Sequence, residues 1–507
     1  MDVLTLSLCS FLLFYFIISV WRIQKMRLRL PPGPTPLPFI GNLLQVSFAL
    51  YQFYPKLLKQ YGPIFTIWFG SKPVVVLCGY AAIKEALINN SHQFGSRGSL
   101  PISERLADGY GIITTNGERW LQVRRFAMTT LRNFGMGKRS MEERVQEESR
   151  HLIKAIEETR GKAFNPHTVL GRAVNNVINL VVFGRRWDYE DENFLKFLCI
   201  TNNLLNFLRR PLGVAYATFD NLMKHLPGPH QKVFADCDHV KTFISEEINS
   251  HRRSLDPESP RDFIDCFLIQ ANKEKDMKNS EFCQGNLLIS VFELFMAGTE
   301  TTSSTLQFSL LVMIKHQKIQ ERIQEEIDSV TGPDIIPSIA NRLEMPYTNA
   351  VIHEIMRYLD LAPMSLAHKV TEDTNFRGFT LPKGTTVIPL LGSALSDPEC
   401  WKSPYDFNPE NFLDENGKFC PHEAMIPFSA GKRICPGEGL ARMEIFLFLT
   451  ALLQKFSFHP ANPTDTFNLE VLRRANRKKG LSYNFRANPR MEKMNRHTSP
   501  RLKDTLQ

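Results

Sequence analysis

The segment from Phe428 to Gly437, with the sequence FSAGKRICPG, constrains this chain more than any other because it surrounds Cys435 with several spaced partners. Gly431 lets the backbone turn close to a flat ligand, and Arg433 can pair with a carboxylate of that ligand. The proline and glycine after the cysteine are typical of the start of a helix, whose amide groups and dipole stabilise an anionic sulfur. A lone cysteine is usually a buried apolar residue, but this pattern predicts a thiolate ligand of haem iron, which favours O–O cleavage.

The same segment carries a family resemblance. Its Phe, Gly, Arg, Cys and Gly at fixed spacing resemble the signature of the cytochrome P-450 superfamily, and further motifs occur in that family's order as far as about Pro489. Residues 131–137 and the proline-rich start resemble vertebrate microsomal family 2. The resemblance implies the cytochrome P-450 fold, mainly α with a smaller β region. It also implies haem b (iron protoporphyrin IX), with Cys435 as the axial ligand of the iron and with Phe428 and Arg433 beside the cofactor.

Composition excludes some classes of protein. The 507 residues, 43% hydrophobic and 22% charged, are enough for one large globular core or several small ones. Nine cysteines include no CxxC or paired spacing, which argues against a disulfide framework or a zinc site and favours a reducing compartment. The net charge of +9 suits an anionic membrane surface or an acidic protein partner. No basic arm interleaved with aromatic residues indicates nucleic-acid binding.

The N-terminal region predicts a membrane anchor. Val3 to Trp21 is a run of 19 residues without a charge, close to the ~20 that span a bilayer as a helix. Basic residues follow at positions 22, 25, 27 and 29, so the positive-inside rule places the rest of the chain in the cytosol. A cleaved secretory signal fits poorly, because the positive charge follows the apolar run and no A-x-A-like site is present. With the resemblance to microsomal enzymes, this predicts a single-pass protein of the endoplasmic reticulum membrane.

A proline-rich segment, PPGPTPLP at residues 31–38, follows the predicted anchor. Its spacing is incompatible with a helix interior and predicts a stiff extended linker, with a proline-rich binding site for a partner as the weaker alternative. The expected organisation is a transmembrane anchor at 1–21, a basic and proline-rich linker at 22–45, a haem-thiolate catalytic domain at 46–489 and a disordered basic tail at 490–507.

A long helix is predicted from Gln284 to about Lys315, with no Lys or Arg between Leu287 and Ile314. Hydropathy alone would allow a second membrane span. Glu293, Glu300 and the Ser/Thr-rich stretch 299–305 are too polar for lipid contact. A helix buried through a large core therefore fits better.

The centre of this helix, AGTETT at residues 297–302, resembles the oxygen-binding groove of the family. The small Ala297 and Gly298 would leave room for a ligand above a flat cofactor. The resemblance assigns Thr301 to a water that delivers protons to dioxygen, and Glu300 to refilling that relay, a general-acid role suited to a carboxylate. Without the cysteine segment, a Ser/Thr-rich helix bonding its own carbonyls would explain the pattern equally well.

Glu354 and Arg357, at i and i+3, are expected on one helix face. A surface ion pair of this kind contributes only ~0–1 kcal/mol. The resemblance instead makes the two residues the family's ExxR pair, a buried lock on the haem-binding core. The family often places an arginine as the third partner, where this chain has Asn411. A neutral side chain or main-chain carbonyls must then complete the network.

Four further residues match propionate contacts of the family. Trp120 and Arg124 form its W-x-x-x-R pair, and Arg97 and His368 match two contacts of related vertebrate enzymes. Two carboxylates that enter a low-dielectric interior need charged or hydrogen-bonding partners. Singly, each residue would more often be an ordinary surface group. With Arg433, the four residues form one predicted set, called the clamp below.

The resemblance also implies a substrate pocket walled by Ile113, Thr114, Ala297, Thr301, Ala362 and Leu366. These side chains predict a largely apolar cavity for lipophilic small molecules such as fatty acids, steroids or foreign aromatic compounds. Residues 198–240 are expected to form a mobile roof. Relatives carry an apolar hairpin near the C-terminus, whereas residues 473–480 here contain five charges. Those charges are expected to be solvated, and a cation that faces the pocket and favours an acidic substrate is the alternative.

The first functional hypothesis is a membrane-bound haem monooxygenase that inserts one oxygen atom of O2 into a lipophilic substrate, by hydroxylation or epoxidation. Its electrons would come from NADPH through NADPH-cytochrome reductase, a flavoprotein, with cytochrome b5 as an additional partner, because the chain shows no nicotinamide or flavin motif. A basic set would form the docking face, with surface solubility as an equal alternative. The members of this set are Arg125, Arg132, Lys138, Arg139 and Lys432.

Two other hypotheses stay open. A haem-thiolate isomerase that rearranges lipid peroxides needs no reductase, but it also needs no proton relay, so Glu300 and Thr301 argue against it. A non-catalytic haem or gas sensor is the other alternative, and no added sensor or effector domain supports it. NADPH consumption coupled to product would distinguish the three.

Overall fold

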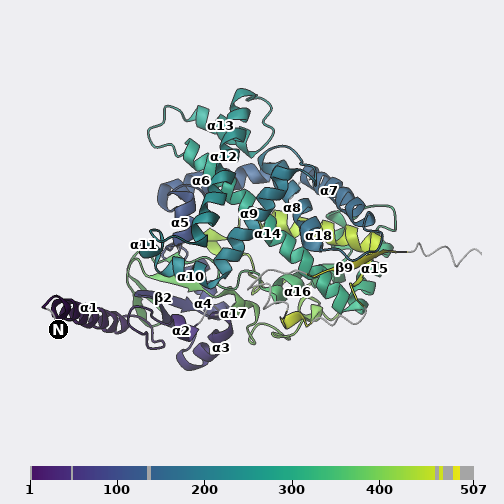
Figure 1. The fold of residues 1–507 in the computed structure, drawn as a ribbon. Coiled ribbons are helices and arrows are strands. Elements are labelled where there is room, and N and C mark those ends of the chain that lie inside the picture. The colour runs from purple at the N-terminus through teal and green to yellow at the C-terminus, as the bar shows by residue number, and fades with distance from the viewer. Residues whose placement is uncertain (1–2, 47–49, 134–138, 463–467, 472–482, 491–507) are drawn as a thin grey trace, which may run out of the picture.

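The computed structural model describes residues 3–46, 50–133, 139–462, 468–471 and 483–490. Within the helices, the side chains of residues 3–6, 8, 9, 11, 12, 15, 46 and 50–53 are not described. Helices make up most of this chain, and a small sheet region lies at the end where α1 (Val3–Arg27) joins the body (Figure 1). The fold is therefore mainly α with a smaller β region, as predicted.

The helices after α1 are α2 (Leu43–Val46), α3 (Leu50–Tyr61), α4 (Tyr80–Lys84), α5 (Pro101–Ala107), α6 (Gly117–Asn133), α7 (Arg139–Glu157), α8 (Pro166–Val182), α9 (Glu192–Arg209), α10 (Pro211–Thr218), α11 (Asp220–Met223), α12 (Pro229–Arg253), α13 (Phe263–Lys273), α14 (Gln284–Lys315), α15 (Gln317–Val330), α16 (Pro346–Leu359), α17 (Leu391–Leu395) and α18 (Glu438–Lys455). Shorter helical turns are η1 (Glu85–Asn89), η2 (Ala340–Leu343), η3 (Pro409–Phe412) and η4 (Gly431–Arg433). The strands are β1 (Ile64–Phe69), β2 (Lys72–Leu77), β3 (Ser96–Arg97), β4 (His368–Lys369), β5 (Thr374–Phe376), β6 (Phe379–Leu381), β7 (Thr386–Pro389), β8 (Phe456–Pro460) and β9 (Phe485–Pro489).

The five-stranded sheet has the order β1-β2-β7-β4-β3. β1 and β2 pair in antiparallel register, with Lys72 opposite Phe69 across the turn that joins them. β2 runs parallel to β7, and β4 runs antiparallel to both β7 and β3. The β3–β4 register places Arg97 opposite His368. Two predicted clamp residues, far apart in the sequence, thus become direct neighbours.

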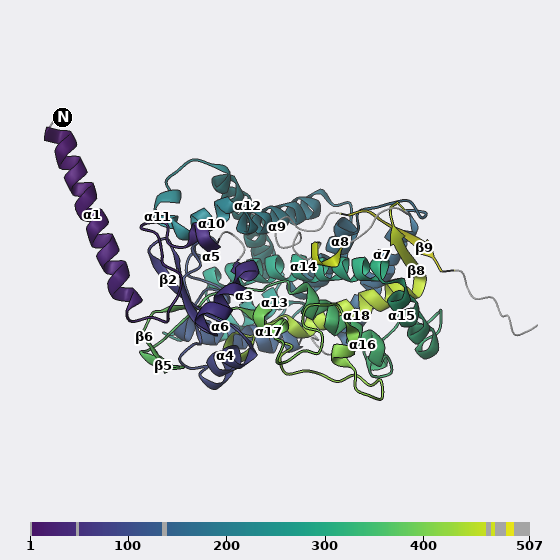
Figure 2. The ribbon, with the colours of Figure 1, turned by 90° about the horizontal axis from the view of Figure 1, so that it is seen from below.

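The proline-rich linker lies along β1. The Pro32 carbonyl oxygen accepts the backbone N–H of Thr66 at 3.0 Å. A Cβ on Gly33 would lie 1.9 Å from the Thr66 carbonyl oxygen, so only glycine allows this close approach. The linker is therefore fixed to the sheet, while α1 extends away from the body (Figure 2). Within the described residues, no helix is both long enough and apolar enough to cross a membrane.

The long central helix α14 has the predicted bounds and passes through the middle of the helical body (Figures 1 and 2). Helices α8, α12, α16 and α18 pack around it. Its hydroxyl groups bond to carbonyls one turn earlier, as Thr305 does to Thr301 and Ser309 to Thr305, both at 2.8 Å. This local bonding lets polar side chains be buried in the core. The prediction of a helix through a large core is confirmed.

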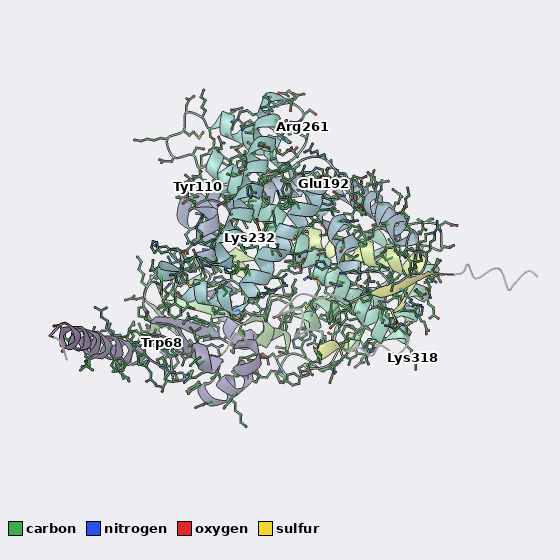
Figure 3. All side chains as sticks on the ribbon, viewed as in Figure 1. Trp68, Tyr110, Glu192, Lys232, Arg261 and Lys318 are labelled. Carbon is green, nitrogen blue, oxygen red and sulfur yellow. The ribbon has the colours of Figure 1, made fainter. Side chains whose placement is uncertain are left out.

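The predicted roof, residues 198–240, consists of most of α9 together with α10, α11 and the first half of α12. Figure 3 labels Glu192 at the start of α9 and Lys232 in α12, and it shows Lys318 of α15 far from Trp68 of β1.

The charged segment 473–480 and tail residues 491–507 lie outside the described residues, as do residues 134–138, which include Lys138 of the predicted docking face.

Candidate cofactor and active site

Cys435 lies between η4 and the start of α18. Its backbone N–H donates to the Phe428 carbonyl oxygen at 2.9 Å, and its sulfur accepts the backbone N–H groups of Gly437 and Glu438. Because α18 begins at Glu438, the preceding proline and Gly437 lead into the helix and do not form its first turn. The sulfur therefore has the amide donors that stabilise a thiolate.

Burial raises the pKa of the Cys435 thiol, whereas the two N–H groups and Arg124 act in the opposite direction. The side chain is nevertheless exposed. Both observations hold for a sulfur that lies deep among protein atoms with one side uncovered. A metal cation bound on that side would favour the thiolate strongly.

Gly431 and Phe428 shape the loop around the cysteine. Gly431 has a φ of +70°, and a Cβ there would lie 1.9 Å from the Leu87 carbonyl oxygen of η1. The Arg442 guanidinium lies 5.1 Å from the centre of the Phe428 ring. The loop is therefore held closely against η1 on one side and against α18 on the other.

Two of the predicted clamp residues, Arg433 and Arg124, lie near a third, Trp120 of α6. The guanidinium carbon of Arg433 lies 3.8 Å from the Trp120 ring centre, and that of Arg124 lies 5.7 Å away. Burial first, and then repulsion from Arg97 and Arg124, lowers the pKa of Arg433 to about 9. Burial and Arg124 likewise lower the pKa of Arg97 to about 10. The cluster is thus a buried concentration of positive charge that favours an anionic ligand.

Several polar atoms of the clamp lack partners among the described residues. Trp120 Nε1, His368 Nε2 and Arg433 Nη1 are buried without a hydrogen bond, although buried polar groups are normally bonded. His368 Nδ1 lies 2.7 Å from the Phe94 carbonyl oxygen, to which it donates. Burial and the neighbouring arginines lower the pKa of His368 to about 3. A carboxylate at Nε2 would favour the doubly protonated ring, which donates from both nitrogens.

These five clamp residues and the cysteine loop fit haem b. The cluster offers unused hydrogen-bonding groups and positive charge for two carboxylates, and Cys435 offers a sulfur for iron. The sequence motifs predicted this gathering, but the neighbouring Asn116 was missed. Its Oδ1 accepts both Arg433 Nη2, at 2.7 Å, and the Arg97 backbone N–H, also at 2.7 Å. No sequence pattern distinguishes this asparagine from other loop asparagines.

The middle of α14 presents two exposed side chains, Ala297 and Thr301, among buried neighbours. The hydroxyl group of Thr301 donates to the Ala297 carbonyl oxygen at 2.8 Å, so its oxygen can still accept a hydrogen bond. The Cα of Gly298 faces α8, because a Cβ there would lie 2.5 Å from Ile178 Cδ1 of that helix. The prediction that Gly298 makes room for a ligand is therefore wrong, and this glycine allows α8 and α14 to pack closely.

Glu300 is buried on the α8 side of α14. Its Oε2 lies 3.2 Å from His167 Nε2, and its Oε1 accepts the Ser304 hydroxyl at 3.0 Å. Successive helix residues project about 100° apart, so Glu300 must turn away from His167 to reach the Thr301 face. Sequence reasoning missed His167, which lies 133 positions away along the chain.

The predicted wall residues come from three parts of the chain. Ala362 and Leu366 are exposed, as is Ala297 on α14, whereas Ile113 and Thr114 are half-buried. The clamp reaches this wall through the backbone, because Arg97 donates to the Leu366 carbonyl oxygen at 3.3 Å and to the Ile113 carbonyl oxygen at 3.2 Å. Arg97 therefore connects the predicted clamp to the predicted wall.

The predicted lock is buried on α16. Arg357 Nε and Nη2 each donate to one oxygen of Glu354 at 2.7 Å, and the two side chains are 1% and 0% exposed. Asn411 Nδ2 approaches both oxygens of Glu354, at 3.4 and 3.3 Å. The remaining Arg357 donors reach the carbonyl oxygens of residues 395, 403, 404 and 406. Both predicted substitutes for a third arginine, a neutral side chain and main-chain carbonyls, thus complete the network.

A cysteine with amide donors at its sulfur, a cationic clamp and a central helix with an exposed hydroxyl group fit a haem-thiolate enzyme. Comparison with known proteins agrees, since residues 31–481 match the family described as Cytochrome P450. The chain is 49% identical over 460 residues to cytochrome P450 2G1 of Oryctolagus cuniculus, covering 90% of this chain and 92% of the relative. It is 50% identical over 453 residues to cytochrome P450 2C20 of Macaca fascicularis, covering 89% and 92%. It is 48% identical over 464 residues to cytochrome P450 2A13 of Homo sapiens, covering 91% and 94%.

This chain therefore belongs to the cytochrome P450 family. It is a monooxygenase, an oxidoreductase whose cofactor is haem b. The family 2 relatives confirm the resemblance that residues 131–137 and the proline-rich start predicted.

Proposed function

We propose that this chain is an endoplasmic reticulum monooxygenase that oxidises lipophilic small molecules, with electrons from NADPH delivered through a flavoprotein reductase. The observation that carries the proposal is the joint geometry of the Cys435 loop and the clamp. Thiolate-ligated haem supplies O–O bond cleavage.

In this proposal, Cys435 would supply the sulfur that binds the haem iron, and the amide groups of Gly437 and Glu438 would hold that sulfur in the anionic form. The two cofactor carboxylates would be held by Arg97, Trp120, Arg124, His368 and Arg433, and Phe428 would lie beside the cofactor. The carboxylates would neutralise a cluster that otherwise repels itself. Glu354 and Arg357 maintain the core beneath the cofactor.

Thr301 and Glu300 are proposed as the catalytic pair. The Thr301 hydroxyl group bonds to the helix backbone, so its oxygen is held in place to orient a water. Glu300 would carry a proton from the His167 side of α14 to that water by side-chain rotation. A carboxyl group that alternates between two partners is suited to a general-acid role.

The pocket wall of Ile113, Thr114, Ala297, Ala362 and Leu366 offers mostly apolar surface, which supports lipophilic substrates such as fatty acids, steroids or xenobiotics. Hydroxylation and epoxidation are the expected reactions. No single substrate is favoured by these residues.

The redox partners would dock on the basic set named above. Arg125, Arg132, Arg139 and Lys432 are exposed, and basic side chains attract the acidic surface of a reductase or of cytochrome b5 by electrostatic steering. Arg139 already pairs with Glu143 at 3.2 Å. Its contribution should therefore be the smallest of the four.

The proposed topology is a single-pass anchor formed by residues 1–21, with the catalytic domain in the cytosol. The uncharged run from Val3 to Trp21 and the basic residues after it support this topology. The projection of α1 from the body leaves Phe14, Ile17 and Trp21 exposed.

The reduced carbon-monoxide difference spectrum tests the proposal, with Cys435→Ser beside the wild type. A strongly red-shifted Soret band in the wild type that is lost in the variant is expected. A well-folded, haem-loaded wild type without this band would contradict the thiolate assignment. With reductase present, product formation coupled to NADPH consumption separates a monooxygenase from a lipid-peroxide isomerase or a gas sensor.

A further inference from the structure

The segment from Gly109 to Asn116, called the wall segment here, connects α5 to α6 and carries two residues of the proposed substrate wall, Ile113 and Thr114. It has no helix or strand of its own. Its conformation therefore depends on the groups that bind its backbone, and these come from two sides.

On one side, the wall segment is bound by α14. Glu293 Oε2 accepts the backbone N–H groups of Ile112 and Ile113, at 2.5 and 3.0 Å. Asn286 Oδ1 accepts the backbone N–H of Gly111 at 3.1 Å. Asn286 and Glu293 are seven residues apart, which places them on the same face of the helix two turns apart. Three consecutive amide groups are thus held by one helix face.

The contact is also fitted sterically. Gly111 has a φ of +91°, and a Cβ there would lie 2.5 Å from Glu293 Oε2 and 2.6 Å from Ile289 Cγ2. A Cβ on Gly285 would lie 2.8 Å from the ring of Tyr110, which is labelled in Figure 3. Both glycines therefore permit an approach that any larger residue would obstruct.

Glu293 is a buried carboxyl group, 9% exposed, that the proposed proton relay does not use. Burial raises its pKa to about 8, against the effect of the two N–H donors and of Arg97. Burying a carboxyl group at this position is unfavourable for folding, so its contacts must serve another purpose. A neutral apolar residue would fill the same helix position at lower cost.

On the other side, the wall segment is bound by the clamp. Arg97 Nε donates to the Ile113 carbonyl oxygen at 3.2 Å, and Arg433 Nη2 donates to the Thr115 carbonyl oxygen at 2.9 Å. Beside the segment lies a polar surface pocket of about 350 Å³. Its lining includes Glu104, Thr114, Asn116, Glu118, Arg119 and Glu281. The segment therefore has space into which it can move if α14 releases it.

We propose that Glu293 is a positioning residue that determines substrate size by holding the wall segment against α14. This inference rests on the proposed function, because it assigns Ile113 and Thr114 to the substrate wall. Without the Glu293 contacts, the segment relaxes toward the polar surface pocket and the substrate cavity widens. Larger substrates then gain relative to smaller ones, while the cysteine ligand and the clamp side chains remain in place.

The first test is amide hydrogen exchange of the full-length holoprotein. Glu293→Leu should accelerate exchange of the amides of residues 111–113 by about tenfold or more, since local opening controls their protection. Glu293→Gln keeps an oxygen acceptor and should give a smaller effect. The matched control is Glu444→Leu, which removes another buried carboxyl group, in α18. It should leave these three amides unchanged.

The second test measures size selectivity with imidazole, phenylimidazole and biphenylylimidazole as probes, from their Soret shifts in the holoprotein. Glu293→Leu should raise the affinity ratio of biphenylylimidazole to phenylimidazole by roughly fivefold. Gly111→Ala disturbs the same contact from the other side and should act in the same direction, which covers the case in which Glu293→Leu does not fold.

Unchanged exchange and an unchanged affinity ratio, in a variant that keeps the red-shifted carbon-monoxide band, would overturn the role of Glu293. Equal changes in Glu444→Leu would also overturn it, because they would indicate general loosening. Absence of the band from the wild type would instead contradict the proposed function, and the exchange experiment distinguishes that failure because it does not depend on the band.

Discussion

Replacing Arg357 with methionine should cause a far larger loss of stability than a surface ion pair would explain. The substitution leaves Glu354 buried, with only the Asn408 backbone N–H at 2.7 Å and the longer Asn411 contacts. Breaking one side of a buried ion pair costs about 3–5 kcal/mol. Four carbonyl oxygens also lose their donor, at about 1–3 kcal/mol for each that stays dry. The total is comparable to the whole stability of a typical domain, about 5–15 kcal/mol.

The assay is urea unfolding of the purified full-length protein, followed by far-ultraviolet circular dichroism. Three variants separate the contributions: Arg357→Met, Asn411→Ala, and the double variant Glu354→Gln/Arg357→Met. Asn411→Ala should cost only about 1–2 kcal/mol, because its contacts to Glu354 exceed 3.2 Å. The double variant should be more stable than Arg357→Met by about 2 kcal/mol or more, because glutamine removes the unpaired charge.

The pH dependence of Arg357→Met adds a second check. Burial already raises the pKa of Glu354 in the wild type, and loss of Arg357 raises it further. A carboxyl group with a raised pKa takes up a proton on folding, so stability falls as pH rises through that range. Arg357→Met should therefore be more stable at pH 5.5 than at pH 8, relative to the double variant. Equal stability of the single and double variants at both pH values would refute the reasoning.

Three other changes test the packing and electrostatics of the core. Gly298→Ala should lower the free energy of unfolding by about 1–3 kcal/mol through overpacking. Combining it with Ile178→Ala should relieve part of that loss, as measured by urea unfolding midpoints. If the two losses of stability simply add, the contact between these residues is contradicted. Gly431→Ala should lose most haem at assembly, measured as haem per protein, because its Cβ meets the Leu87 carbonyl oxygen; full loading would contradict the fit. Burial and nearby arginines lower the pKa of His353 to about 3. As pH falls below about 6.5, the unfolded chain therefore takes up a proton at this residue that the folded chain does not, and stability should fall by about 1.4 kcal/mol per pH unit. In His353→Gln, unfolding measured as a function of pH should lack this part of the decrease.

Much of the site could be predicted because its residues occur in short motifs whose spacing fixes their relation. Cys435 and its amide donors lie within four residues of one another, and Trp120 and Arg124 are one helical turn apart. The bounds of α14 were also predictable, because the chain carries no Lys or Arg over a long apolar stretch. In each case the information is local, so a sequence can hold it without a structure.

What could not be predicted depends on packing between distant segments. Gly298 was assigned to the ligand groove, but its direction is set by how Ile178 of α8 approaches α14. The His167–Glu300 pair has the same origin. Glu293 did leave a signal, an acidic residue inside an apolar helix, seven positions from Asn286. That signal excluded a membrane span without indicating which amides the carboxylate binds.

The proposed role of the clamp would link cofactor binding to folding in this protein. Arg97 comes from a strand, Arg124 from α6 and Arg433 from the cysteine loop, so only the folded chain brings the three cations together. Burial and mutual repulsion lower the pKa of both Arg97 and Arg433, which means that the assembled cluster opposes folding until an anion neutralises it. A ligand that binds only the folded state stabilises it by mass action. If the clamp holds the two carboxylates of haem b, as proposed, the cofactor removes an electrostatic cost that the fold itself creates. Arg97 and Arg433 also fix the backbone of the wall segment. Loading of the cofactor and shaping of the proposed substrate wall would then be a single event in the assembly of the enzyme.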